Sequence, residues 1–340
     1  MVMKTLNDVA QAMVTPGQGI LAADESTPTI KKRFDLIEVG STDQNRNAYR
    51  DLLFTSNGIE KYISGVILFD ETLRQSTLSD GIPYPEHLTG LGIIPGIKVD
   101  KGAKPLAGME GEKITEGLDG LGDRLKEYYK LGARFAKWRA VLTIDDEFPS
   151  SNCIGANAHA LARYAALCQE ENLVPIVEPE ILMDGTHSID DSFIVTEEVL
   201  HSVFYELYLQ GVVLEEMNLK PNMVVSGYSA DDQASIEEVA ELTVSVLKRA
   251  VPAAVPGIAF LSGGQSDEFA TAHLNAMNQL LLDHKPWNLT FSYGRALQAP
   301  ALKVWKGKAE NSKSAQEAFM KRAKLNSLAT LGKYDPKMEE

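Results

Sequence analysis

The sequence predicts a (β/α)₈ barrel, the TIM-barrel fold of the α/β class, as a single domain over residues 1–340. Eight short runs of apolar and β-branched residues, each bounded by turn residues, have the length of β-strands. Segments with helical periodicity lie between them, and strands that alternate with helices are typical of a parallel sheet. Eight such repeats fit a closed barrel.

The strands are expected, in chain order, at residues 19–24, 64–69, 94–100, 133–139, 174–180, 218–224, 257–264 and 289–295. Among the helices, segment 235–250 opens with a Ser235 to Glu238 capping box and carries apolar residues at helical spacing. A second helix is predicted over 196–211, and a C-terminal helix with a short tail over 300–340. An open doubly wound sheet is the alternative, which is disfavoured because no GxGxxG motif follows the first strand.

The composition limits the partners. The formal net charge is −14, with 44% hydrophobic and 24% charged residues, as in an ordinary globular protein. Nucleic acid and anionic membranes are disfavoured as partners because both need a broad basic surface, whereas a few basic residues in one cleft can bind a small phosphate ester. Cys153 and Cys168 form no CxxC pair, and no apolar run approaches membrane-spanning length. A cytoplasmic protein is therefore expected.

Charged residues stand where the predicted strands end. Pro221 cannot donate to a strand ladder and holds the residue before it extended, so Lys220 is expected to be the last in-register residue of the sixth strand. By the same argument, Pro179 places Glu178 and Glu180 at the end of the fifth strand.

In the fourth strand, Lys137 and Arg139 are two residues apart and therefore share one side, while Trp138 faces the other. The carboxyl ends of the strands meet at one mouth of a barrel, where barrel enzymes hold their active sites. One charged residue at a strand end is usually only solvated. Charged residues at the end of nearly every strand, however, indicate a functional site. The predicted site also includes Asp24, Lys98, Ser262, Gly263, Gly264, Ser292, Gly294 and Arg295.

Lysine and carboxylate groups in such a mouth suit imine chemistry. A neutral lysine amine attacks a ketone and gives an iminium ion, an electron sink that lets a neighbouring carbon–carbon bond break without a metal or cofactor. Lys220 is the best candidate, because apolar neighbours and a nearby cation such as Lys137 would lower the pKa of its amine. Glu178 and Asp24 supply two carboxylates for the two proton transfers. For Asp24, a helix N-cap or Asx turn is the structural alternative.

Two glycine-containing turns predict a phosphate site. "LSGGQS" follows the seventh strand and "SYGR" the eighth, where barrels commonly bind phosphate through backbone N–H groups, and Arg295 adds a bidentate donor. The six histidines include no HExxH or comparable pair, so no metal site is expected.

Long, rare strings in the sequence carry a family resemblance. They include "GILAADEST", "GIKVDKG", "VPIVEPEIL", "LKPNMV", "FLSGGQS" and "LTFSYGRALQ", and the matching stretches run in family order from about residue 19 to 334. The chain thereby resembles the class I, Schiff-base fructose-1,6-bisphosphate aldolases. The resemblance implies a (β/α)₈ barrel that assembles as a homotetramer. It implies reversible cleavage of fructose 1,6-bisphosphate to dihydroxyacetone phosphate and glyceraldehyde 3-phosphate, with sugar phosphates as the partners and no cofactor.

The resemblance also implies roles by position. Lys220 corresponds to the Schiff-base residue, Glu178 to the acid/base of carbinolamine dehydration, Asp24 to the base at the C4 hydroxyl and Lys137 to the cation that tunes Lys220. Glu180 is a further predicted catalytic residue. The C1-phosphate site corresponds to Ser262, Gly263, Gly264, Ser292, Gly294 and Arg295. The other end of the substrate corresponds to Ser26, Arg33, Lys98 and Arg139.

Two departures from the family pattern stand out. Pro28 and Thr29 replace Gly and Ser in the "STGSIAKR" segment of many relatives. The sequence ends in "GKYDPKMEE", where animal members carry a terminal tyrosine for C3 proton exchange, so another group, water or a slower step is expected. Two other functions stay open: preference for another ketose phosphate, such as fructose 1-phosphate or sedoheptulose bisphosphate, and a non-catalytic scaffold.

Overall fold

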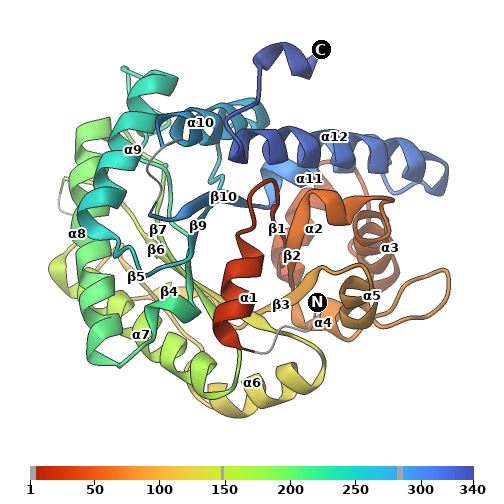
Figure 1. Cartoon of the computed structure of the whole chain (residues 1–340), viewed down its shortest axis with the longest axis horizontal. Coiled ribbons are helices and arrows are strands. Elements are labelled where there is room, and N and C mark those ends of the chain that lie inside the picture. Colours follow the sequence, from red (N-terminus) through yellow and green to blue (C-terminus); the bar gives the residue numbers. More distant parts are fainter. Residues whose placement is uncertain (1–4, 147–148, 282–285) are drawn as a thin grey trace.

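The computed structural model describes residues 5–146, 149–281 and 286–340, and these residues form a closed barrel of eight parallel strands surrounded by helices (Figure 1). Going round the barrel, the strands are β1 (Gly19–Ala23), β2 (Ile63–Leu68), β3 (Ile94–Lys98), β6 (Phe135–Leu142), β7 (Val174–Ile181), β8 (Asn218–Leu219), β9 (Gly257–Phe260) and β10 (Asn288–Tyr293). Because β1 pairs with both β2 and β10, the sheet has no edge. The predicted fold class is confirmed, and the open doubly wound sheet is excluded.

Helices cover the outside of the barrel. In chain order they are α2 (Thr27–Asp35), α3 (Asp43–Phe54), α4 (Asp70–Leu73), α5 (Tyr84–Gly90), α6 (Leu121–Lys130), α7 (Ser151–Glu170), α8 (Ile189–Leu209), α9 (Ile236–Ala250), α10 (Asp267–Leu280), α11 (Arg295–Trp305) and α12 (Ser312–Thr330). Short 3₁₀ turns are η1 (Ile59–Lys61), η2 (Leu214–Glu216), η3 (Ala309–Asn311) and η4 (Pro336–Glu339). Outside the barrel, β4 (Ala103–Pro105) and β5 (Lys113–Thr115) form an antiparallel hairpin.

The helix predictions hold with two refinements. The segment 300–340, predicted as one C-terminal helix with a tail, contains the end of α11, the 3₁₀ turn η3, all of α12 and the 3₁₀ turn η4. Helix α9 begins after its N-cap Ser235, whose side chain accepts the N–H of Glu238 at 3.2 Å, which is one of the two bonds of the predicted capping box. The segment predicted as a helix over 196–211 is the second part of the longer α8. That helix begins earlier, at a complete capping box between Ser188 and Asp191.

The sixth strand is shorter than predicted. β8 covers only Asn218–Leu219 instead of 218–224, and Lys220 lies one residue beyond it. The Lys220 N–H still donates to the Val177 carbonyl at 2.8 Å, so the backbone stays extended to that point. Pro221 then has no N–H to donate, and beyond it the Asn222 side-chain oxygen accepts the N–H of Ile181 at 3.1 Å.

Pro179 does not end the fifth strand, which continues to Ile181. Residues of β7 bond alternately to its two neighbours: the N–H of Val174 bonds toward β6, and the carbonyl of Val177 bonds toward β8. Pro179 therefore faces the β8 side, where β8 has already ended. The missing N–H costs no ladder bond there, and both Glu178 and Glu180 remain inside the strand.

The amino-terminal half of the barrel interior is apolar and closed by α1 (Leu6–Met13). This helix begins at a capping box between Thr5 and Asp8. Its last turn is tied to the barrel by the Ser64 hydroxyl, which donates to the Met13 carbonyl at 2.6 Å, and by the Asn218 amide, which donates to the Ala10 carbonyl at 3.0 Å. Among the described residues, the amino-terminal end of the barrel is thus a packed core, and a cavity opens at the carboxyl end.

Close packing inside the barrel gives a stability prediction. A Cβ added at Gly96 would lie 2.2 Å from the ring of Phe135, which is fully buried on the paired strand. We expect Gly96→Ala to lower the free energy of unfolding by about 1–3 kcal/mol, the usual cost of overpacking. Urea unfolding measures it. In the matched control Gly155→Ala, on α7, the added Cβ meets nothing within 4 Å, and stability should be unchanged or slightly higher. Equal effects would contradict the packing argument.

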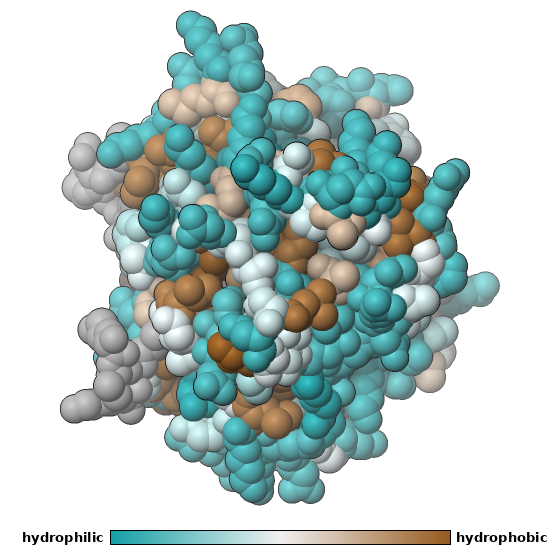
Figure 2. Space-filling model, turned by 90° about the vertical axis from the view of Figure 1, so that its right-hand side faces the viewer, coloured by the Kyte–Doolittle hydropathy of each residue, from teal (hydrophilic) through white to brown (hydrophobic). Residues whose placement is uncertain are grey.

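The surface is mainly hydrophilic on the side of α3 and α5, with hydrophobic residues scattered in small groups (Figure 2). This pattern agrees with the net charge of −14. None of the helices in the described ranges combines the length with the apolar composition that a membrane span requires.

Candidate active site

A cavity of about 330 Å³ opens at the carboxyl ends of the barrel strands. It brings together residues from nearly every strand, as the sequence predicts. The predicted site residues that line it are Asp24, Ser26, Arg33, Lys98, Lys137, Arg139, Glu178, Glu180, Lys220, Ser262, Gly263, Ser292, Gly294 and Arg295.

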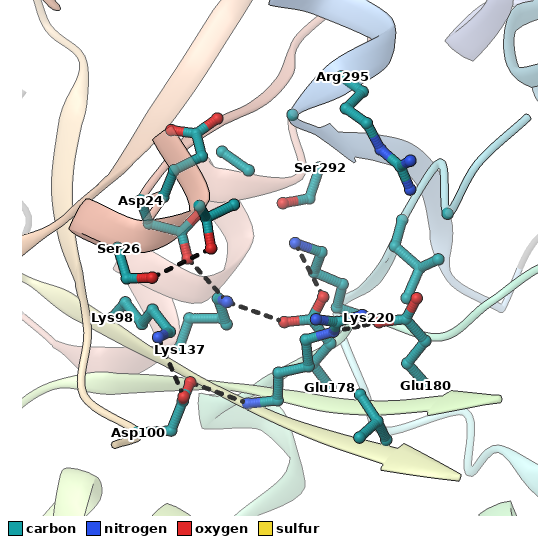
Figure 3. Close-up of a pocket in the computed structure, with 18 of the residues that line it drawn as sticks. Asp24, Ser26, Lys98, Asp100, Lys137, Glu178, Glu180, Lys220, Ser292 and Arg295 are labelled. Carbon is teal, nitrogen blue, oxygen red and sulfur yellow. Dashed lines mark hydrogen bonds and ion pairs between the residues drawn. The ribbon is translucent and has the colours of Figure 1, made fainter. Parts of the chain in front are cut away.

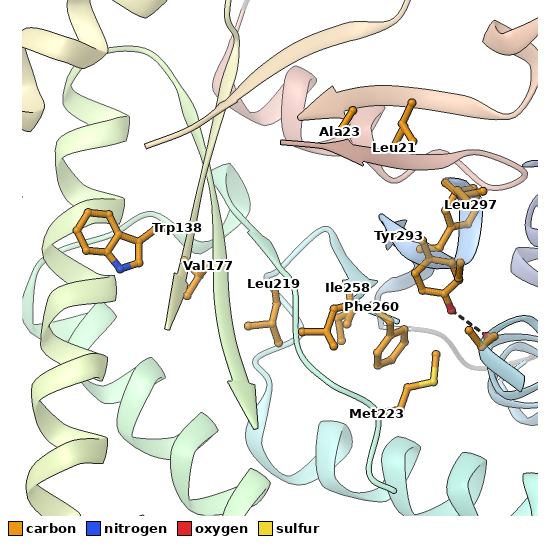
Figure 4. Close-up of a cluster of buried hydrophobic side chains, with 14 of the residues drawn as sticks. Leu21, Ala23, Trp138, Val177, Leu219, Met223, Ile258, Phe260, Tyr293 and Leu297 are labelled. Carbon is orange, nitrogen blue, oxygen red and sulfur yellow. Dashed lines mark hydrogen bonds between the residues drawn. The ribbon is translucent and has the colours of Figure 1, made fainter. Parts of the chain in front are cut away.

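Strand alternation decides which side chains reach this cavity. Lys137 and Arg139 line it, whereas Trp138, between them on β6, is fully buried on the outer side of the strand. The Trp138 ring packs 5.6 Å from the ring of Tyr164 on α7. Figure 4 shows the buried cluster to which Trp138 belongs, which also includes Val177, Leu219, Ile258 and Phe260.

The centre of the site is a chain of four charged groups. Lys137 Nζ lies 2.7 Å from Asp24 Oδ2 and 3.3 Å from Glu178 Oε2. The other oxygen of Glu178, Oε1, lies 3.1 Å from Lys220 Nζ. Figure 3 shows Lys137 between the two carboxylates and Glu178 between the two lysines. Glu178 is therefore the group through which the two amines are connected.

Asp24, Lys137 and Glu178 are held in the charged form by their neighbours. Burial alone would raise the pKa of the Asp24 carboxyl, but attraction to Lys137 and then to Lys220 lowers it. Burial alone would lower the pKa of the Lys137 amine, but Asp24 and Glu178 raise it. Burial likewise opposes ionisation of Glu178, and the same two lysines lower its pKa. Lys137 is thus a fixed cation beside two carboxylates at neutral pH.

Asp24 is not the cap of the helix that follows it. The N-cap of α2 is Ser26, which has extended backbone angles and makes no side-chain capping bond. The Ser26 hydroxyl lies 3.1 Å from the hydroxyl of Thr29, and both residues line the cavity. Pro28 occupies the first turn of α2, where a proline is tolerated because its missing N–H has no partner inside the helix.

Asp100 is a site residue that sequence reasoning missed. It is buried, and its carboxylate lies 3.2 Å from Lys98 Nζ. Its Oδ1 also accepts the N–H of Gly102 at 3.1 Å, so it fixes the loop after β3 as well as the lysine. The signal was available, since residues two apart in an extended segment face the same side.

Glu25 is the second missed residue, and it carries a larger network. Its carboxylate binds the guanidinium groups of Arg33 and Arg50 and accepts the side-chain N–H of Gln298 at 2.9 Å. Burial alone would raise the pKa of Glu25, but the two arginines lower it. Arg33 lines the cavity, whereas Arg50, from α3, is buried behind it. Glu25 therefore holds in place one of the predicted substrate-contacting cations.

The far side of the mouth suits an anion. Gly294 is the N-cap of α11 and lines the cavity with Arg295, so the N-terminus of that helix, whose first N–H groups have no partner within the helix, lies at the cavity. The hydroxyl of Ser292 is buried and has no hydrogen-bond partner within the described ranges. The Arg295 guanidinium belongs to a residue that also lines the cavity. A phosphate group would supply the acceptors that these donors lack.

Gly264 does not line the main cavity, where the predicted phosphate site placed it. It lines a neighbouring cavity instead, and its N–H donates to the hydroxyl of Tyr228 at 2.6 Å. Ser262 and Gly263, which precede it, do line the main cavity.

Within the part of the chain that the structure describes, no group of three or more His, Cys, Asp or Glu side chains is placed to hold a metal ion.

A closed parallel barrel whose carboxyl mouth gathers buried lysines, carboxylates and anion-binding turns defines an enzyme of the (β/α)₈-barrel class. Residues 5–340 match the family model described as fructose-bisphosphate aldolase class-I. The chain therefore belongs to the class I fructose-bisphosphate aldolase family.

Individual relatives agree along nearly the whole chain. A "probable fructose-bisphosphate aldolase class 1" from Xanthomonas axonopodis pv. citri is 60% identical over 335 residues, which is 98% of this chain and 99% of the relative. "Fructose-bisphosphate aldolase 4, cytosolic" from Arabidopsis thaliana is 58% identical over 94% of this chain and 81% of its own length. A solved structure of fructose-bisphosphate aldolase from Plasmodium falciparum, in complex with TRAP and a small-molecule inhibitor, superposes with a TM-score of 0.94 at 55% identity. The superposition covers 97% of this chain and 95% of the Plasmodium falciparum chain.

Proposed function

We propose that the Lys220, Glu178, Asp24 and Lys137 cluster carries out the family's reaction through a covalent imine. As a class I fructose-bisphosphate aldolase, the chain is a lyase of glycolysis and gluconeogenesis. It reversibly cleaves D-fructose 1,6-bisphosphate to dihydroxyacetone phosphate and D-glyceraldehyde 3-phosphate. The observation that carries the mechanistic proposal is the buried ion pair of 3.1 Å between Lys220 Nζ and Glu178 Oε1.

That geometry supplies the first half of the reaction. A carboxylate 3.1 Å from an ammonium group can accept its proton and leave the neutral amine that the attack requires. The amine of Lys220 then bonds to the C2 carbonyl carbon of the sugar, which gives a carbinolamine. Glu178 returns the proton to the C2 hydroxyl, water leaves, and the lone pair of nitrogen forms the iminium bond.

The second half uses the other carboxylate. Asp24 takes the proton of the C4 hydroxyl, the C3–C4 bond breaks, and its electron pair moves to C3 and into the iminium, which becomes an enamine. Glyceraldehyde 3-phosphate leaves as the aldehyde. Protonation at C3 and hydrolysis of the imine release dihydroxyacetone phosphate and the Lys220 amine. Before the cleavage step, the Lys137 cation keeps Asp24 ionised and ready to act as the base.

The remaining predicted residues bind the substrate in this proposal. One phosphate binds the turns after β9 and β10, with Arg295, and the other binds on the Ser26, Arg33 and Lys98 side. Glu180 acts by holding Arg139. The reaction needs neither metal nor cofactor, because the iminium is the electron sink. The Arabidopsis relative is named cytosolic, which supports a cytosolic location here too.

A homotetramer is part of the proposal. Helix α8 and the turn after it expose a group of large apolar residues that a contact between copies would cover: Ile194, Tyr205, Tyr208, Leu209 and Val213.

Borohydride trapping tests the imine directly. With dihydroxyacetone phosphate and EDTA present, reduction should fix the three-carbon unit on the peptide that holds Lys220, with one label per chain. Label on another lysine, or none, would overturn the mechanism. Comparison of kcat/KM for fructose 1,6-bisphosphate and fructose 1-phosphate then tells whether both phosphate subsites are used.

A further inference from the structure

The turn formed by residues 262–264, after β9, faces the main cavity on one side and contacts Tyr228 on the other. Its inner side, Ser262 and Gly263, lines the main cavity. Its outer side is held by the Gly264 N–H, which donates to the hydroxyl of Tyr228 at 2.6 Å. A Cβ added at Gly264 would lie 2.7 Å from this hydroxyl, so the backbone approaches Tyr228 as closely as only glycine allows.

Tyr228 is itself fixed by the loop after β7. Its N–H donates to the carbonyl of Met183 at 2.9 Å, and its hydroxyl lies 3.0 Å from the Met183 sulfur. On either side of it, the N–H groups of Gly227 and Ser229 donate to the carbonyls of His187 and Gly185 at 2.9 Å. The hydroxyl therefore reaches the 262–264 turn from a backbone that has its own anchors.

The turn has two further contacts: the Gln265 N–H donates to the Ser262 carbonyl at 3.1 Å, and a Cβ added at Gly263 would lie 2.6 Å from the Met183 sulfur. Behind Tyr228 and Gly264 lies a second cavity of about 340 Å³, which is also lined by Phe269 and His273. Tyr228 is 44% exposed, so its ring is not clamped by close packing. On the other flank, the Gln265 side chain lies 2.6 Å from His273 Nδ1. The hydrogen bond from the Gly264 N–H to the Tyr228 hydroxyl is thus the directed polar contact that fixes the Gly264 backbone, in addition to the packing of the turn.

We propose that Tyr228 is a positioning residue for phosphate binding, acting through the Gly264 N–H on the 262–264 turn. This inference rests on the proposed function, which assigns one substrate phosphate to that turn. A turn held in its binding geometry before the ligand arrives avoids the free-energy cost of ordering it on binding. Tyr228 touches neither the ketone nor the imine, so it acts on the affinity for the phosphate and not on the chemical step.

The test is Tyr228→Phe, which removes the hydroxyl and keeps the ring. The KM for fructose 1,6-bisphosphate should rise roughly two- to tenfold, the worth of one net hydrogen bond, while kcat changes less than about twofold. The concentration of dihydroxyacetone phosphate that half-saturates borohydride trapping should rise by the same factor. For dihydroxyacetone, which has no phosphate, trapping should be as in the unmodified protein.

The matched control is Tyr129→Phe, since the Tyr129 side chain is 39% exposed and its hydroxyl makes no hydrogen bond to another described residue. It should change neither KM nor trapping. An unchanged KM in Tyr228→Phe, or an equal loss of trapping with dihydroxyacetone, would overturn the positioning role. Failure of the proposed function looks different, because the unmodified protein would then give no label at Lys220 with either ketone.

Discussion

Replacing Lys220 by methionine is expected to lower kcat for fructose 1,6-bisphosphate cleavage by at least about 10⁴-fold, because removal of a covalent nucleophile leaves only binding and electrostatic effects. Methionine keeps an unbranched, apolar stem in a position that is 3% exposed. Glu178 keeps its other partner, Lys137, at 3.3 Å, so its charge stays compensated and the fold should persist. Steady-state kinetics measures the loss of kcat, and circular dichroism shows whether the fold persists.

Lys137→Met is the decisive comparison, because both lysines contact Glu178 at similar distances, 3.1 and 3.3 Å. If Lys220 alone forms the imine, borohydride still labels Lys220 in Lys137→Met, although turnover is slower. The exposed Lys126→Met, in contrast, should behave as the unmodified protein. Undiminished trapping in Lys220→Met, or label at Lys137, would show that the nucleophile is another residue.

The sequence predicts the barrel and most of its mouth because local rules decide both. Strand alternation sends Lys137 and Trp138 to opposite sides, and the observed burial agrees. The prolines were harder to interpret. Pro221 does accompany the end of β8, whereas Pro179 lies inside β7, because its neighbour on that side is already absent. A proline's effect on a strand depends on the length of the next strand, which no local rule supplies.

The contacts that were missed depend on distant segments. Glu25 lies 25 residues from Arg50 and 273 from Gln298, and only the folded barrel brings the three together. The bond from Gly264 to Tyr228 likewise joins two strand-end loops 36 residues apart. Asp100 is different, since its spacing from Lys98 was visible in the sequence. Tertiary partners of a polar residue are thus the part of a site that sequence periodicity leaves open.

Replacing Glu25 by glutamine is expected to lower the free energy of unfolding by about 3–5 kcal/mol, the typical cost of breaking a buried ion pair by removing one partner. The Glu25 side chain is 4% exposed and that of Arg50 is 3%, so water cannot replace the lost charge. One Nη of Arg50 already has no hydrogen-bond partner within the described ranges. Loss of the Glu25 charge would therefore leave a buried guanidinium with still fewer partners. Arg33 should also lose its fixed position, and the KM for fructose 1,6-bisphosphate should rise. Thermal or urea unfolding measures the loss of stability, and steady-state kinetics measures the rise in KM.

Asp35→Asn on α2 is the matched control, because its ion pair with Lys31 is exposed, at 54% and 61%, and such pairs are worth about 0–1 kcal/mol. The double variant Glu25→Gln, Arg50→Met should recover part of the stability, because an apolar side chain then replaces the uncompensated buried guanidinium. It should not recover the KM, since Arg33 still lacks its carboxylate. If Glu25→Gln were no less stable than Asp35→Asn, the buried network would be held by other contacts, and Glu25 would not be the residue that positions Arg33.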